Sequence, residues 1–205
     1  MGAGPRIAPG STREIGLANA AIVRVLGAAA GGGEPPRIFT TLARHRGLFR
    51  RWLLFAGALM PGGTLPRDEA ELVILRVARN TGCDYERVQH ERLAQRAGLS
   101  AEEVARALGE GADAPGWSPR RALLLRAADE LHADGRIGDE LWAALAREYD
   151  ERRLIELCLL IGHYEMLAMT LRSLDLGPDP VPDPHAAAGS PLTRLVQRAA
   201  ARRGA

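Results

Sequence analysis

The sequence predicts an all-α protein of about eight helices, and three observations support this. Alanine, leucine and arginine dominate the composition, whereas aromatic residues make up only 4% of it, and such a mixture favours helices over strands. No run of alternating β-branched residues occurs. Apolar segments of helical length are separated by glycine and proline, which end helices. The 205 residues are enough for one sizeable core.

The helices are expected in the following order. Ser11 and Glu14 form a capping box before the first of them, and "GGGEPP" ends it. "PGGTLP" follows the second helix as a loop, and Gly82 ends or kinks the third. Ser100 and Glu103 cap the fifth helix, and Ser118-Pro119 opens the sixth. The expected helical segments are 15–30, 37–60, 67–82, 83–98, 101–111, 120–135, 139–150 and 151–177.

The chain divides into three parts by composition. Residues 1–34 are expected to form an N-terminal helix and loop, and residues 35–177 the main helical domain. Residues 178–205 begin as a proline-rich linker and end in "PLTRLVQRAAARRGA", a short basic tail. The tail is expected to be frayed or docked on a partner, and a membrane-surface or nucleic-acid role is the less favoured alternative.

Charge and cysteine content narrow the class of protein. The net charge is only +2, and no helix-turn-helix with a basic recognition helix is present, so a nucleic-acid partner is not expected. The N-terminus lacks the apolar core of a signal peptide, and no stretch approaches eighteen apolar residues, so a membrane partner is not expected either. The two cysteines, Cys83 and Cys158, form no disulfide framework, and a cytoplasmic location is predicted.

The segment "NTGCDYERVQHERLAQ" carries the candidate site. On a helix, Cys83, Glu86 and His90 occupy positions i, i+3 and i+7 and therefore share one face. Glu86 and His90 are four residues apart and are expected to hydrogen-bond. Taken alone, this pattern is also typical of a solvated helix face, and a lone cysteine is more often a small core residue than a nucleophile.

The preceding helix favours a catalytic interpretation. Glu71 lies among apolar neighbours in "RDEAELVILRVARN", so its carboxylate needs a partner or a cavity. If the chain turns near Gly82, Glu71 faces the same pocket as Cys83 and His90. Arg76 is a candidate to hold a substrate carboxylate, as is Arg79.

Two further features are open to more than one interpretation. Tyr85 either packs in the core or reaches a ligand. "LVILRVARNTGCDYE" and "LIELCLLIGHYE" both pass from an apolar helix through glycine to Tyr-Glu. This similarity reflects either a duplicated helical hairpin or chance in a leucine-rich chain. His163 lies in the second segment and is expected to be a core or interface histidine.

The stretch "LPRDEAELVILRVARNTGCDYERVQHERLAQRAGLSAEEVARAL" resembles the carboxymuconolactone decarboxylase family, which includes the alkylhydroperoxidase D-like proteins. The resemblance extends over about residues 35–177. It implies an all-helical, alkylhydroperoxidase D-like bundle that assembles with itself as a trimer or hexamer. It also implies a pocket for a small-molecule substrate at or near the subunit contacts.

In the peroxidase branch of this family, a Cys-x-x-Cys pair is served by a glutamate and a histidine that relay protons. The matching positions here are Glu71, Cys83, Glu86 and His90, and Glu86 stands in place of the second cysteine. No intramolecular Cys-x-x-Cys disulfide can form. The replacement removes dithiol chemistry and leaves acid/base groups, as in the decarboxylase branch.

The resulting hypothesis is cofactor-free acid/base chemistry, either decarboxylation or proton transfer, on a small carboxylated or lactone-like substrate. His90 is expected to donate the proton, Glu86 to orient it, and Glu71 to relay protons. The first alternative is a single-cysteine peroxidase or antioxidant activity through Cys83. The second is a non-catalytic, oligomeric ligand-binding scaffold. Neither a metal site nor a bound cofactor is expected, because the chain lacks His-Glu-x-x-His, clustered cysteines and a paired Glu-x-x-His motif.

Overall fold

The computed structural model describes residues 4–29 and 35–179, and within these ranges the chain forms ten helices and no strand. The all-α class predicted from the sequence is therefore confirmed. The expected proline-rich linker and basic tail lie almost entirely outside the described residues. In chain order the helices are α1 Thr12–Ile15, α2 Leu17–Ala29, α3 Arg37–Leu42, α4 Arg46–Leu59, α5 Arg67–Thr81, α6 Asp84–Arg96, α7 Ala101–Gly109, α8 Pro119–Asp134, α9 Asp139–Glu148 and α10 Glu151–Ser173.

Two breaks raise the number of helices from the expected eight to ten. Gly16 takes a φ of 81°, which is the left-handed region open to glycine, and this ends α1 before α2 begins. The second expected helix is divided by a turn at residues 43–45 into α3 and α4. Gly82 has a φ of 64° and caps α5, as its place in the sequence predicts.

The chain forms two compact units, of which the first comprises residues 1–54 and 179–205. Its core brings the short helices α1 to α3 together with the first part of α4. Phe49 is 1% exposed and its ring stacks on that of Trp52, which also lies against Phe39. The boundary expected at residue 34 remains a prediction, whereas the two compact units divide within α4. The reason is that α3 and α4 pack their aromatic residues against the N-terminal helices.

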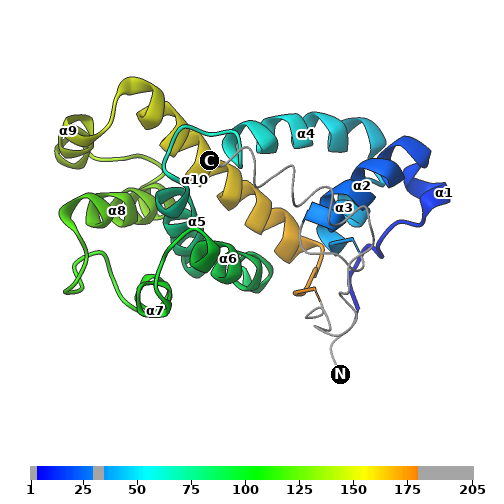
Figure 1. Ribbon diagram of the computed structural model, residues 1–205, viewed down its shortest axis with the longest axis horizontal. Coiled ribbons are helices and arrows are strands. Elements are labelled where there is room, and N and C mark those ends of the chain that lie inside the picture. Colours follow the sequence, from blue (N-terminus) through cyan, green and yellow to red (C-terminus); the bar gives the residue numbers. More distant parts are fainter. Residues whose placement is uncertain (1–3, 30–34, 180–205) are drawn as a thin grey trace. The chain divides into compact units, whose positions relative to one another are not determined.

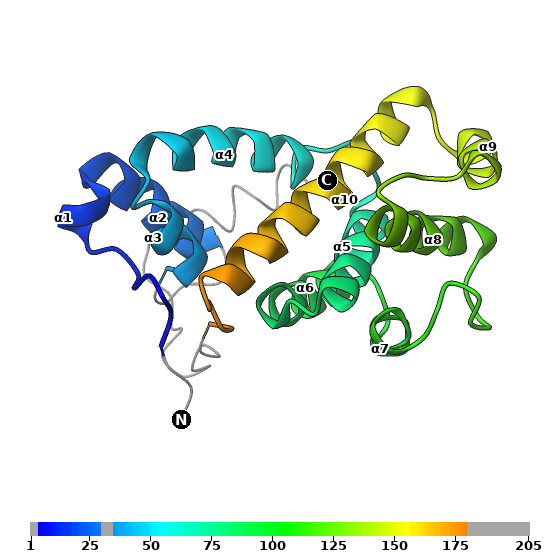
Figure 2. The same cartoon turned by 180° about the vertical axis from the view of Figure 1, so that it is seen from behind.

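The second unit, Phe55–Pro178, is built around α5. Helices α6, α7, α8 and α10 all pack against α5 (Figures 1 and 2). Residues 69–78 of α5 are buried on every side, and a helix that is covered all round is typical of a core. The cluster between α5 and its neighbours consists of Leu72, Leu75, Ala94, Leu99, Val104, Ala107, Ala112 and Leu125.

Helix α10, with 23 residues, is the longest helix described. By length and composition it could cross a membrane, with a mean hydropathy of 1.5 over its most apolar window. Half of that window is buried inside the protein, and core helices of globular proteins pass the same test. Its contacts with α5, α8 and α9 agree with the sequence-based interpretation of a core helix.

Glu156 of α10 fixes the loop that precedes α5. Its carboxylate accepts hydrogen bonds from the backbone N–H groups of Thr64 at 2.6 Å and Leu65 at 3.0 Å, and from the Thr64 hydroxyl at 2.6 Å. Partial burial raises the pKa of the Glu156 carboxyl, but the hydrogen bonds from residues 64 and 65 lower it by more. The pKa is therefore below its ordinary value. This contact sets where α5 starts, and α5 carries the central residue of the candidate site.

Candidate active site

Glu71 is the most deeply buried charged residue described, with no exposed surface. It lies on the second turn of α5, after the acidic residues Asp68 and Glu69 of the first turn. Two cationic or titratable side chains meet its carboxylate. Oε2 lies 2.6 Å from Nδ1 of His90, and Oε1 lies 2.7 Å from the guanidinium of Arg67. The second contact is an ion pair without the angles of a hydrogen bond.

The contact between His90 and Glu71 joins the middle of α6 to α5. It fixes the orientation of the histidine ring, because a carboxylate on Nδ1 selects the tautomer that carries the proton there. The second ring nitrogen, Nε2, is then free to exchange a proton with another molecule. The His90 side chain is 12% exposed, so it lies at the edge of the buried region. This arrangement has the geometry of a catalytic dyad.

Glu86 does not form the expected hydrogen bond with His90, and that prediction is wrong. The histidine turns across to α5, where Glu71 approaches within hydrogen-bonding distance. Glu86 is 2% exposed, and neither of its carboxylate oxygens has a hydrogen bond of ordinary geometry among the described residues. Burial has the largest effect on its pKa and raises it, donation by the Cys83 thiol lowers it, and the charge of Glu165 raises it; the result is a pKa of about 8. Glu86 is therefore largely protonated at neutral pH.

Cys83 lies at the N-cap of α6, next to Glu86, and is 2% exposed. A helix N-terminus favours a thiolate, but burial and the charge of Glu86 act the other way. They raise the pKa of the thiol to about 11. At neutral pH only about one thiol in 10⁴ is then ionised. The second cysteine, Cys158, belongs to α10 and is free. The thiol thus has the environment of a packing residue.

Tyr164 belongs to the site although the sequence did not single it out as a site residue. Its ring lies edge-on to that of His90, with the centroids 5.1 Å apart. Burial raises the pKa of its phenol, and the charges of Glu71 and Glu86 add to the effect. The Tyr-Glu repeat was the one sequence feature that pointed to this position. The neighbouring His163 is 5% exposed and lies edge-on to Phe55 and Tyr164, as expected of a core histidine.

Arg76 is not available to a substrate, which corrects the role expected for it. It is 4% exposed and forms a bidentate pair with Asp129 of α8 at 2.6 and 2.7 Å. The same guanidinium donates to the backbone carbonyls of Ala107, at 3.2 Å, and Glu110. Arg76 therefore ties α5 to α7 and α8.

Tyr85 and Arg79 also contact the protein itself. Tyr85 is 4% exposed and belongs to the buried core of the second unit. Arg79 lies on the surface, where it donates to the carbonyl of Leu108 at 3.1 Å. In place of these residues, Arg67 is the arginine that reaches the Glu71–His90 dyad, and its side chain is 42% exposed. The sequence offered no feature that separates Arg67 from the other arginines.

Within residues 4–29 and 35–179, no three His, Cys, Asp or Glu side chains are placed to hold a metal ion. Glu71 and His90 pair with each other, and Glu86 forms a hydrogen bond with neither of them. The site described by these residues consists of acids, bases and one thiol.

Residues 46–130, which contain α5, α6 and α7 and therefore Glu71, Cys83, Glu86 and His90, match the model of the carboxymuconolactone decarboxylase family. Over this segment, 85 of the 205 residues, the chain is similar to the carboxymuconolactone decarboxylase family. The matched segment starts in α4 and ends in α8, so it covers most of the helices around α5. This similarity supports an enzymatic or antioxidant role at the level of the family.

Solved structures share this fold at low sequence identity. One is an alkylhydroperoxidase AhpD core, an uncharacterized peroxidase-related protein from Ralstonia eutropha JMP134, with a TM-score of 0.76 and 16% identity over 87% of this chain and 94% of that one. Another peroxidase-related protein, from Silicibacter sp. TM1040, has a TM-score of 0.72 and 12% identity over 91% and 97%. The debrominase Bmp8 has a TM-score of 0.70 and 14% identity over 94% and 96%. No curated protein matches the sequence.

Proposed function

We propose that the protein is an enzyme that performs cofactor-free acid/base chemistry, a decarboxylation or a proton transfer, on a small carboxylated or lactone-like substrate. The 2.6 Å contact between the buried carboxylate of Glu71 and Nδ1 of His90 carries this proposal. It provides an oriented general acid/base at the edge of a buried region. A group of this kind contributes about 10²- to 10⁴-fold to a rate.

In a decarboxylation, the bond between the substrate carbon and its carboxylate breaks, and CO₂ leaves. The electron pair flows into a conjugated carbonyl and forms a dienolate. His90 then delivers the proton on Nε2 to carbon, while Glu71 stabilises the imidazolium before transfer. The protonated carboxyl of Glu86 donates a hydrogen bond to the dienolate oxygen. In a site that excludes water, stabilising this oxygen contributes more to the rate than the proton transfer from His90 does.

Arg67 is suited to hold the substrate carboxylate. Its guanidinium lies beside Glu71, and the ion pair leaves most of its five N–H groups for another anion. It is partly exposed, so an incoming anion can reach it without disturbing the core. Bmp8 was also solved, as a cysteine-to-alanine variant, with 2,3,4-tribromopyrrole. A fold of this kind therefore accommodates a small ring, which agrees with a lactone-sized substrate.

The proposal is tested by incubating the protein in D₂O with a panel of small unsaturated carboxylic acids and carboxylated lactones. We expect deuterium to enter one carbon of a turned-over compound, observed by NMR. The rate should fall as the pH rises through about 8, because Glu86 then loses its proton. A rate that rises through this range would contradict the role of Glu86 as an acid.

The alternative function is a peroxidase that uses Cys83 as its one nucleophile. The likeness to two peroxidase-related structures favours it, whereas the raised pKa of the thiol opposes it. In that chemistry the thiolate attacks a peroxide oxygen, gives a sulfenic acid and releases an alcohol or water. An external thiol must then reduce the sulfenic acid. Peroxide consumption that disappears in Cys83→Ser would support this alternative.

We also propose that the protein assembles with copies of itself through α10. Four large apolar side chains on this helix are between 46% and 64% exposed. With the exposed Gly162 they follow steps of four and three residues, which is the spacing of a helix–helix seam. These apolar residues are Ile155, Leu159, Met166 and Met169.

Light scattering at micromolar concentration is expected to give a trimer or hexamer. The double variant Ile155→Glu and Met169→Glu should have a smaller particle mass than the wild-type protein. The reason is that its new carboxylates would be buried without partners at the contact between α10 helices. Arg147→Glu is the matched control, since Arg147 is an exposed residue of α9 and does not lie on this helix. A wild-type protein that is monomeric under these conditions would contradict the proposal.

A further inference from the structure

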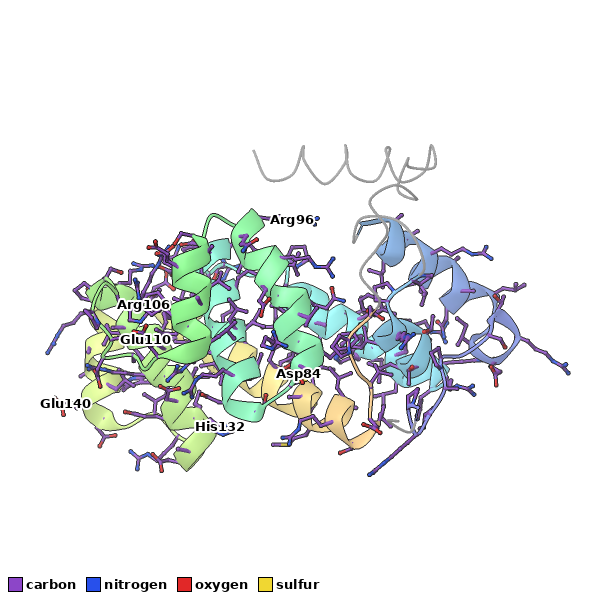
Figure 3. All side chains as sticks on the ribbon, turned by 90° about the horizontal axis from the view of Figure 1, so that it is seen from below. Asp84, Arg96, Arg106, Glu110, His132 and Glu140 are labelled. Atoms are coloured by element: carbon purple, nitrogen blue, oxygen red, sulfur yellow. The ribbon has the colours of Figure 1, made fainter. Side chains whose placement is uncertain are left out.

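The hydrogen bond of the dyad holds only one atom of the histidine ring. His90 lies midway along α6, whose two ends, Asp84 and Arg96, are labelled in Figure 3. Its Nδ1 lies 2.6 Å from Oε2 of Glu71. Such a bond fixes which nitrogen faces the carboxylate, but the ring can still tilt about the line that joins the two atoms. Because a general acid/base must point Nε2 at the reacting atom, a second contact is needed to fix the tilt.

Tyr164 of α10 makes a second contact with this ring. The centroids of the Tyr164 and His90 rings are 5.1 Å apart, and their planes meet at 89°. Aromatic rings favour perpendicular contacts at about 4.5–7 Å, because the positive edge of one ring meets the negative face of the other. Tyr164 is 8% exposed, so the surrounding protein limits its movement. His90 is thus held by Glu71 from α5 and by Tyr164 from α10.

Two further rings support Tyr164 from behind. His163 lies edge-on to Tyr164, with the centroids 5.3 Å apart and the planes at 84°. Phe55 lies edge-on to His163 at 5.4 Å and 72°. His163 is 5% exposed, whereas Phe55 of α4 is 42% exposed. The four rings therefore form a continuous row of contacts from the dyad to the surface of the second unit.

We propose that Tyr164 is a positioning residue, whose ring fixes the tilt of His90 and thereby the direction in which Nε2 meets a substrate. The contact is made by the ring, so the role does not depend on the phenol hydroxyl. Tyr164 forms and breaks no bond in this role. His163 assists by holding the Tyr164 ring in place.

This inference deepens the proposed function and rests on it for its catalytic meaning. The tilt of His90 matters to turnover only if Nε2 exchanges a proton with a substrate. The tilt itself, however, is a property of the protein without substrate. It can therefore be measured separately from activity.

The test uses the full chain with ¹⁵N-labelled histidines, and the His90 signals are assigned by their loss in His90→Gln. Two-bond ¹H–¹⁵N spectra over a pH series show which nitrogen of the neutral ring carries the proton. For the wild-type protein and Tyr164→Phe we expect one neutral form, with the proton on Nδ1. For Tyr164→Leu we expect both neutral tautomers, because a ring that tilts freely loses its aligned hydrogen bond to Glu71.

Tyr149→Leu is the matched control, because it also removes a buried tyrosine of the second unit. Tyr149 is 4% exposed, its hydroxyl donates to Glu69 at 3.0 Å, and Arg120 lies over its ring. Its loss should destabilise the fold but leave the His90 tautomer unchanged. The control therefore separates a loss of stability from a loss of positioning.

A second variant tests the row one ring further from the dyad and serves if Tyr164→Leu does not fold. His163→Leu removes the support behind Tyr164 and should also give a mixture of His90 tautomers. His163→Phe keeps a ring at this position and should give the single wild-type form. A single wild-type form in His163→Leu and in any folded Tyr164→Leu would overturn the inference, even if turnover by the dyad is found.

The deuterium-incorporation assay gives an independent readout once a substrate is known. Tyr164→Leu should lower kcat by about tenfold to a hundredfold with little change in KM, because a misdirected group reacts slowly while binding is retained. Tyr164→Phe should keep a rate close to that of the wild-type protein. If Tyr164→Phe were as slow as Tyr164→Leu, the hydroxyl would carry the effect and the positioning role of the ring would be wrong.

Discussion

His90→Gln is expected to lower turnover by about 10²- to 10⁴-fold, which is the contribution of a general acid/base. Glutamine keeps a similar size and one hydrogen bond to Glu71, but it cannot deliver a proton. Because His90 is 12% exposed and lies at the edge of the core, the fold should remain intact. Circular dichroism and thermal unfolding would check the fold, and the deuterium-incorporation assay would measure turnover.

Glu71→Gln tests the other half of the dyad. It removes the charge that stabilises the imidazolium and leaves Arg67 without its anion. Turnover should fall, but by less than in His90→Gln, because the proton donor itself is retained. Glu91→Gln is the control, since among the described residues Glu91 pairs with Arg87 of the same helix and not with the dyad. Unchanged turnover in either dyad variant would exclude the proposed mechanism.

Arg76→Ala is expected to destabilise the protein by about 3–5 kcal/mol, the cost of breaking a buried ion pair by removing one partner. The substitution would remove the donor to the backbone carbonyls of Ala107 and Glu110. The Asp129 carboxylate would lose its bidentate partner and keep the bond that Asn80 donates to its Oδ1 at 2.8 Å. Urea unfolding would measure the change in the free energy of unfolding.

Arg79→Ala provides the matched control three residues along the same helix. Arg79 is exposed and donates to one carbonyl, that of Leu108, so its loss should cost less than about 1 kcal/mol. If Arg76→Ala were as mild as Arg79→Ala, the structural role assigned to Arg76 would be wrong. Arg76 would then again be a candidate to bind a substrate carboxylate.

Much of the fold could be predicted because local rules determine it. The capping boxes at Ser11 and Ser100 and the glycine after α5 all lie where the sequence placed them. The break at Gly16 was missed, because a glycine inside an apolar helical pattern does not reveal its φ angle. The turn at residues 43–45 that separates α3 from α4 was missed for a different reason. It depends on aromatic packing between segments, which periodicity does not describe.

Spacing along the chain predicted some contacts of the site and missed others. The position of Glu71 among apolar residues correctly indicated a buried carboxylate that needs a partner. The i, i+4 rule favoured Glu86 as the partner of His90, but Glu71 on a neighbouring helix forms that contact instead. Helical spacing identifies which residues share a face, whereas the packing of α5 against α6 decides which of them meet.

Sequence patterns did not predict the contacts between segments that are distant along the chain. Tyr164 reaches His90 from α10, and Oε1 of Glu165 on the same helix lies 2.8 Å from Nδ1 of His132 on α8. Arg67 and Arg76 are both arginines of α5, yet one meets the dyad and the other binds α7 and α8. Only the direction of each side chain on the folded helix separates their roles.

The replacement of a second cysteine by Glu86 is the feature on which the functional account depends. The most direct test is the turnover of Cys83→Ser in the deuterium-incorporation assay, beside the wild-type protein. We expect the variant to keep the wild-type rate within a few-fold, because the buried thiol is neutral and takes no part in proton transfer. Loss of all activity in Cys83→Ser, with an intact fold and a wild-type protein that consumes peroxide, would show instead that the thiol carries the chemistry.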